Sequence, residues 1–103
     1  MHPLIANQKS QISDLCRRFH VRRLEIFGSA ARGDDFDPSR SYIDFLVEFE
    51  SDTSANLFEC YFGLQRALEA LLNRDVDLLT RSAIQNPFVK ASIDRSRELV
   101  HGA

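Results

Sequence analysis

The chain has 103 residues and a formal net charge of −2, and 44% of its residues are hydrophobic while 27% are charged. These values are typical of a globular protein, and the length predicts a single domain over residues 1–103. The near-neutral charge gives no reason to expect direct binding to nucleic acid. No apolar run approaches the roughly 20 residues that a membrane span needs, so no contact with a membrane is expected.

The N-terminal part of the sequence predicts a helix, a strand and a short helical turn. Four apolar residues recur at the spacing of one helix face, namely Ile12, Leu15, Cys16 and Phe19. They predict an amphipathic helix over residues 4–20. Residues 24–27 predict an apolar strand that stops at Gly28, and residues 29–32 predict one helical turn. Turn-forming residues over 34–41 then predict a loop.

The clearest predicted strand covers residues 42–50, where the side chains alternate between two faces. One face is apolar and consists of Ile43, Phe45, Val47 and Phe49. The other face consists of Tyr42, Asp44, Leu46 and Glu48. Because the second face is too polar to be buried entirely, we expect solvent or a ligand to cover it.

The C-terminal half predicts a long helix, a third strand and a last helix. Apolar residues between Leu57 and Leu72 follow helical spacing, with a cap expected within residues 51–56 and Asn73 at the left-handed C-terminal position. Residues 76–79 predict a strand. A final, weaker amphipathic helix is predicted from Pro87, with Asn86 as its N-cap, along a stripe formed by Val89, Ile93, Ser96 and Val100.

Helices that alternate with strands predict an α/β (or α+β) fold. We expect a small mixed sheet of about three strands, covered by helices mainly on one side. Both cysteines, Cys16 and Cys60, lie within helical apolar patterns. They predict buried free thiols rather than a disulfide, as is usual in a reducing compartment. Residues 1–9 lack the layout of a signal peptide, and a cytoplasmic protein is therefore expected.

Two groups of residues carry the chemistry of the sequence. Gly28 and Ser29 follow a strand and open a helical turn, where backbone N–H groups and the hydroxyl could donate to a phosphate, with Arg32 as a charged partner. Asp44 lies on the polar face of its strand, and Asp77 points away from the core on another strand. We expect these two carboxylates to converge beside the bend at Gly28.

At these residues the sequence resembles a known family. Residues 28–33 read Gly-Ser-Ala-Ala-Arg-Gly, and after a short loop residues 41–47 read Ser-Tyr-Ile-Asp-Phe-Leu-Val. This is similar to the signature of the minimal nucleotidyltransferase (MNT) family, G-S-x-A-R-G followed by S-D-x-D and apolar residues. Residues 76–80 resemble the family's third-carboxylate strand, and residues 86–95 also look like MNT proteins. The resemblance covers essentially the whole chain.

The resemblance implies a fold, a reaction and a partner. It implies the nucleotidyltransferase fold of the DNA polymerase beta type, with Gly28, Ser29 and Arg32 at the triphosphate of ATP or another NTP. Asp44 and Asp77 would hold Mg²⁺, and a nucleoside monophosphate would be transferred while pyrophosphate leaves. Family members commonly act as antitoxins of HEPN-domain toxins, and some transfer AMP to a tyrosine of the toxin.

The sequence departs from the family pattern at Tyr42, where the family has the first Asp of its pair. A phenol has a reference pKa of about 10 and brings no negative charge at neutral pH. If about 3–4 kcal/mol of stabilisation is lost, the rate falls by roughly 10²- to 10³-fold.

Three accounts of this position remain open: natural degeneration, a deliberate inactivating substitution, and replacement of the missing carboxylate by Asp34, Asp35 or Asp37. Two functions therefore compete, both compatible with one fold. The first is an impaired nucleotidyltransferase in which Asp77 activates the attacking hydroxyl. The second is an inactive antitoxin that acts by binding its toxin.

Overall fold

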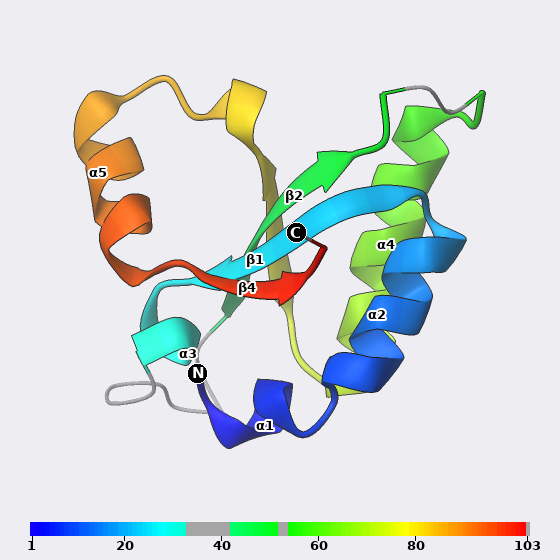
Figure 1. Cartoon of the computed structure of the whole chain (residues 1–103), viewed down its shortest axis with the longest axis horizontal. Helices are drawn as coiled ribbons and strands as arrows, with labels where there is room; N and C mark the ends of the chain where they lie inside the picture. Colours follow the sequence, from blue (N-terminus) through cyan, green and yellow to red (C-terminus); the bar gives the residue numbers. More distant parts are fainter. Residues whose placement is uncertain (33–41, 52–53, 103) are drawn as a thin grey trace.

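A four-stranded sheet forms the centre of the computed structural model, with the strand order β3-β2-β1-β4 (Figure 1). The strands are β1 (Val21–Phe27), β2 (Ile43–Phe49), β3 (Val76–Thr80) and β4 (Glu98–His101). β1 is antiparallel to both β2 and β4, whereas β2 and β3 are parallel. The structure describes residues 1–32, 42–51 and 54–102.

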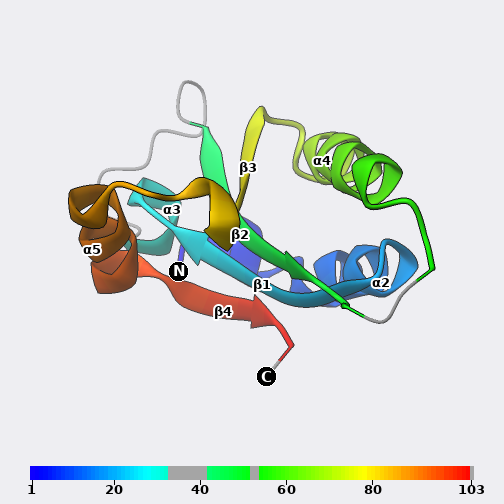
Figure 2. The same ribbon diagram turned by 90° about the horizontal axis from the view of Figure 1, so that it is seen from above.

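Helices lie on both sides of this sheet. The helical elements are α1 (Pro3–Ala6), α2 (Lys9–Arg18), α3 (Ser29–Arg32), α4 (Leu57–Leu72), the 3₁₀ turn η1 (Arg81–Ala83) and α5 (Pro87–Ser96). Figures 1 and 2 show α2 and α4 together on one side of the strands and α5 on the other. No helix in the described ranges has both the length and the apolar character required to cross a bilayer.

The core fills the space between the sheet and the pair formed by α2 and α4. Its fully buried side chains include Ile12 from α2, Leu64 and Leu68 from α4, and Ile26 and Phe45 from the sheet. The apolar face predicted for β2 therefore points into the core, as expected. Cys16 and Cys60 are both buried free thiols, which confirms that prediction. Burial raises the pKa of the Cys16 thiol to about 12.

Local capping explains where the longer helices begin and end. The Asn56 side chain accepts hydrogen bonds from the first backbone N–H groups of α4, and Asn73 ends that helix in the left-handed conformation with φ of +54°. Asn86 caps α5 in the same way, with Pro87 at its first position. These caps confirm the predictions for both helices.

The prediction of about three strands misses a fourth, β4 (Glu98–His101). The expectation that the last helix continues to Val100 is wrong, because α5 ends at Ser96 and Val100 enters the core from β4. The free edge of β1 accepts this segment as an antiparallel partner. An apolar residue four positions beyond a helical stripe fits a strand equally well, and only the available edge decides between them.

One further boundary differs from the sequence prediction. The single helix expected over residues 4–20 is divided into α1 and α2, and the chain bends at Gln8, whose φ is −118°. This bend allows Ile5 and Ile12 to be fully buried together. On the second face of the sheet, Leu46 is also buried, because α5 covers part of that face.

Candidate active site

The pairing of three strands brings Asp44 and Asp77 side by side. In the parallel register of β2 and β3, Asp44 is directly opposite Asp77. In the antiparallel register of β1 and β2, Asp44 is opposite Phe27, the last residue before Gly28. Both acids lie on the sheet face away from α2 and α4, since their strand neighbours Ile43, Phe45 and Val76 are buried in the core.

The backbone of Gly28 lies close to the Asp44 side chain. Its φ is +75°, a left-handed conformation that favours glycine. A Cβ atom added at this residue would lie 2.7 Å from Oδ2 of Asp44, closer than real contacts allow. The backbone of the bend can therefore approach the carboxylate only because residue 28 has no side chain. The structure thus brings Gly28, Asp44 and Asp77 together at one end of the sheet.

The electrostatics of the acid pair favour the presence of a positive charge. The pKa of Asp44 is raised to about 6, first by burial and then by the charge of Asp77 and a hydrogen bond between the two side chains. Two carboxyl groups can share a hydrogen bond only when one of them carries a proton. The carboxylate oxygens of this pair are of the hard, anionic type that Mg²⁺ prefers.

The structure describes less of the remaining predicted site residues. Tyr42 immediately precedes β2, and it is 53% exposed. Ser29 and Arg32 belong to α3, beside the bend at Gly28, but their side chains lie outside what the structure describes. The loop acids considered as substitutes are also outside the described residues, namely Asp34, Asp35 and Asp37. Within the described ranges, no cluster of three or more potential metal-binding side chains is present.

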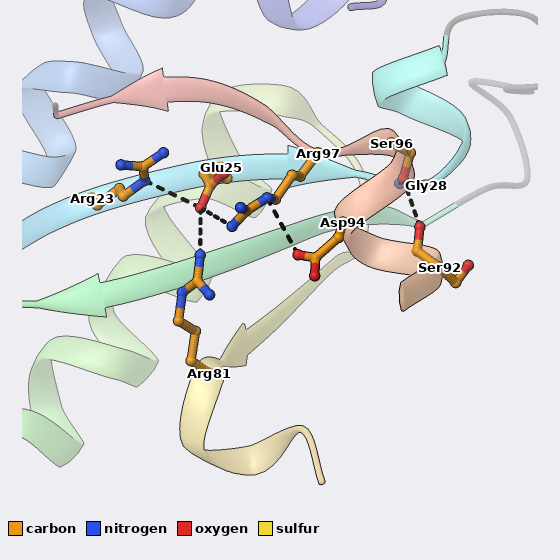
Figure 3. A network of polar contacts seen from close by, with 8 residues as sticks. All are labelled: Arg23, Glu25, Gly28, Arg81, Ser92, Asp94, Ser96 and Arg97. Atoms are coloured by element: carbon orange, nitrogen blue, oxygen red, sulfur yellow. Dashed lines mark hydrogen bonds and ion pairs between the residues drawn. The ribbon is translucent and has the colours of Figure 1, made fainter. Parts of the chain in front are cut away.

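A buried carboxylate, Glu25, lies on the same sheet face as the acid pair, and Figure 3 shows its surroundings. Glu25 is 3% exposed, and its Oε1 lies 3.2 Å from Nε of Arg23, 3.4 Å from Nη2 of Arg81 and 3.5 Å from Nη1 of Arg97. We call these four residues the Glu25 cluster. Sequence reasoning placed Glu25 within an apolar strand and missed the cluster, because Arg81 and Arg97 are distant in sequence.

Sequence reasoning also missed the role of Ser96. The backbone N–H of Gly28 donates a hydrogen bond to the Ser96 hydroxyl at 3.0 Å, across 68 residues of sequence (Figure 3). Ser96 interrupts the apolar stripe of the last predicted helix with a small polar residue. That interruption is the one signal in the sequence that could have singled it out.

Comparisons with known proteins agree on one family. Residues 9–100 match the family of the nucleotidyltransferase domain. The protein adenylyltransferase MntA of Thermococcus cleftensis is 36% identical over 88 residues, which cover 85% of this chain and 81% of that protein.

Solved structures of related proteins have the same fold. A candidate minimal nucleotidyltransferase superposes with a TM-score of 0.73 and 27% identity, covering 95% of each chain. A second structure, of a tri-AMPylated HEPN toxin of Shewanella oneidensis in complex with an MNT antitoxin, has a TM-score of 0.63. This match is 20% identical and covers 96% of this chain and 73% of that chain, so it supports the fold alone.

Proposed function

Because the chain belongs to the nucleotidyltransferase domain family, we propose that it is an MNT-type antitoxin that transfers AMP, or another nucleoside monophosphate, to a HEPN toxin. The acceptor is a hydroxyl group of the toxin, and the activity is weakened or lost because Tyr42 replaces an aspartate. The observation that carries the proposal is the contact of Asp44, paired with Asp77, with the bend at Gly28.

The relatives support the reaction and the partner to different degrees. MntA of Thermococcus cleftensis is a protein adenylyltransferase and shares more than a third of its aligned residues with this chain. The superposition with the HEPN and MNT complex is compatible with a HEPN partner, although it supports the shape of the chain rather than the interaction. The toxin partner therefore rests on the family resemblance.

The acid pair acts on the side of the attacking hydroxyl, and the bend acts on the side of the leaving pyrophosphate. The acceptor hydroxyl oxygen attacks the α-phosphorus of the nucleotide and forms a new P–O bond, while the bond to pyrophosphate breaks. Asp77 accepts the hydroxyl proton, because it is the more exposed of the two acids and can face an incoming acceptor. Gly28, Ser29 and Arg32 hold the triphosphate and then the departing pyrophosphate.

The residues present fit a divalent cation, although incompletely. Asp44 and Asp77 offer adjacent carboxylate oxygens, and the raised pKa of Asp44 shows that a second negative charge there is unfavourable without a cation. Mg²⁺ bound there supplies positive charge that offsets the charge gathering on the reacting phosphate. Tyr42 adds no charge where the family has the first Asp of its pair, so two ions are held poorly.

The direct test compares the protein with its Tyr42→Asp variant and a matched Tyr42→Phe control. Each protein is incubated with labelled ATP, Mg²⁺ and a co-purified HEPN-type partner, and label on the partner is measured. We expect Tyr42→Asp to transfer label about 10²- to 10³-fold faster than the natural sequence, because it restores a metal ligand. Tyr42→Phe restores no charge and should behave as the natural sequence does.

Equal and rapid transfer by the natural sequence and by Tyr42→Asp contradicts the role given to position 42. Tyr42 itself favours a second candidate function, in which the chain neutralises its toxin by binding alone. Absence of transfer by every variant, with tight binding to the partner retained, supports that second function. An increase in melting temperature with ATP and Mg²⁺ separates nucleotide binding from catalysis, because a ligand of the native state must stabilise it.

A further inference from the structure

We propose that Ser96 is a positioning residue for the nucleotide-binding bend at Gly28, an inference that rests on the proposed function. The Ser96 hydroxyl accepts the N–H of Gly28 at 3.0 Å and donates to the backbone carbonyl of Ser92 at 3.5 Å. Figure 3 shows this chain of contacts from the last turn of α5 to the bend. One hydroxyl therefore connects the C-terminal helix to the bend.

The bend needs such an acceptor because the strand ladder ends just before it. β1 ends at Phe27, and the register with β2 extends to the pair formed by Phe27 and Asp44. Gly28 then turns away with its left-handed φ of +75°. Its N–H group is partly buried, and a buried donor without an acceptor is costly. Ser96 satisfies this donor and so favours the observed conformation of the bend.

The position of the bend also determines the space beside Asp44. Because a Cβ at residue 28 would meet Oδ2 of Asp44 at 2.7 Å, a small displacement of Gly28 changes the room available to that carboxylate. The bend would hold the triphosphate, and Asp44 would hold the cation that the triphosphate needs. Ser96 therefore helps to set the distance between the two halves of the site.

The Glu25 cluster fixes the end of α5 from which Ser96 acts. Arg97, the next residue, makes an ion pair with Glu25 on β1 and another with Asp94 on α5, at 3.5 Å and 3.4 Å. Ile93 is the single buried residue of α5, so apolar packing holds this helix weakly. Two consecutive residues, Ser96 and Arg97, thus attach the helix to β1 at positions 28 and 25.

The test measures binding of Mg·ATP by titration calorimetry and amide hydrogen exchange of Gly28 by NMR, in the full chain. Ser96→Ala should weaken ATP binding by about fivefold to tenfold and speed Gly28 exchange, as expected for the loss of one hydrogen bond. Ser96→Thr keeps a hydroxyl at the same position and should restore both values. Ser92→Ala is the matched control, because Ser92 contributes its backbone carbonyl. Unchanged exchange at Leu24 and Ile26 shows that the core is intact.

Two results overturn the role of Ser96 while leaving the proposed function in place. One is faster Gly28 exchange in Ser96→Ala without any change in ATP affinity. The other is tighter ATP binding by Ser96→Ala, which means that the hydroxyl competes with phosphate for the Gly28 amide. If neither the natural sequence nor Tyr42→Asp binds Mg·ATP, the proposed function is wrong and this inference falls with it.

Discussion

One face of the sheet carries two carboxylate sites whose surroundings are opposite in charge. Asp44 faces a second acid, Asp77, and its pKa is raised to about 6. Glu25 lies on β1 opposite Leu46, the next β2 residue on the same face after Asp44, and three guanidinium groups surround its Oε1. The two sites are thus neighbours on the same pair of strands.

The difference separates the structural role of Glu25 from the chemical role that we propose for the acid pair. The charge of Glu25 is balanced within the protein, and the resulting ion pairs join β1, η1 and the end of α5 (Figure 3). The acid pair instead places two like charges together, an arrangement that costs stability and is typical of functional sites. The fold uses arginines for the carboxylate that holds it together and leaves the acid pair suited to an external cation.

Replacing Glu25 should produce the larger loss of stability. Glu25→Gln leaves three arginines without their buried acceptor, and we expect the free energy of unfolding to fall by about 2–3 kcal/mol, less than for a fully buried pair because the arginines can turn to solvent. Urea denaturation measures this value. Glu48→Gln is the matched control on the same face, because its pair with Arg22 is exposed and should be worth less than about 1 kcal/mol. Equal losses in both variants would contradict the structural role of the Glu25 cluster.

Replacing Asp44 should raise the free energy of unfolding, by less than the loss expected for Glu25→Gln. Asp44→Asn removes a half-buried charge that faces Asp77, so without Mg²⁺ at pH 7.5 we expect the protein to gain about 1 kcal/mol of stability, after allowance for solvent screening. The same variant should lose nucleotidyl transfer, measured in the Tyr42→Asp background. Asp75→Asn, at an exposed neighbouring position, provides the control. A loss of stability in Asp44→Asn would show that the acid pair is not strained by its charge.

The smallest expected effect is a pH dependence of stability that comes from Asp44. The pKa of Asp44 is about 6 in the folded chain, against an ordinary value of 3.8. The folded state therefore binds the Asp44 proton more tightly than the unfolded state does. Protonation of Asp44 stabilises the folded state fully below pH 3.8, and this contribution disappears as the pH rises through 6. We expect the advantage of Asp44→Asn over the natural sequence to stay level above about pH 6 and to shrink as the pH falls from about 6 towards 3.8. Denaturation curves of the two proteins at matched pH values measure this difference, and a constant gap contradicts the prediction.

Much of the local structure follows from short-range sequence signals. Asn56, Asn73 and Asn86 mark helix ends because their side chains or backbone conformations act on N–H and carbonyl groups only a few residues away. The alternation from Ile43 to Phe49 identifies a strand and its buried face for the same reason. The motif at Gly28 and the departure at Tyr42 are likewise visible without any structure.

Long-range contacts required the tertiary structure. The fourth strand exists because the edge of β1 is free to pair with Glu98–His101, and no local pattern reports which edge is free. Arg81 reaches Glu25 across 56 residues of sequence, and Ser96 reaches Gly28 across 68. Such partners depend on strand order and on where α5 packs, and neither can be read from neighbouring residues.

The sequence by itself indicated which residues to propose for the chemistry, because a carboxylate, a glycine or a phenol keeps its chemical type and size wherever it lies. The tertiary structure decided how those groups act on one another. The parallel register of β2 and β3 turns two separate aspartates into a repelling pair, and the packing of α5 on β1 supplies Ser96 to the bend. Both effects arise from distances of a few ångströms between segments that are far apart along the chain.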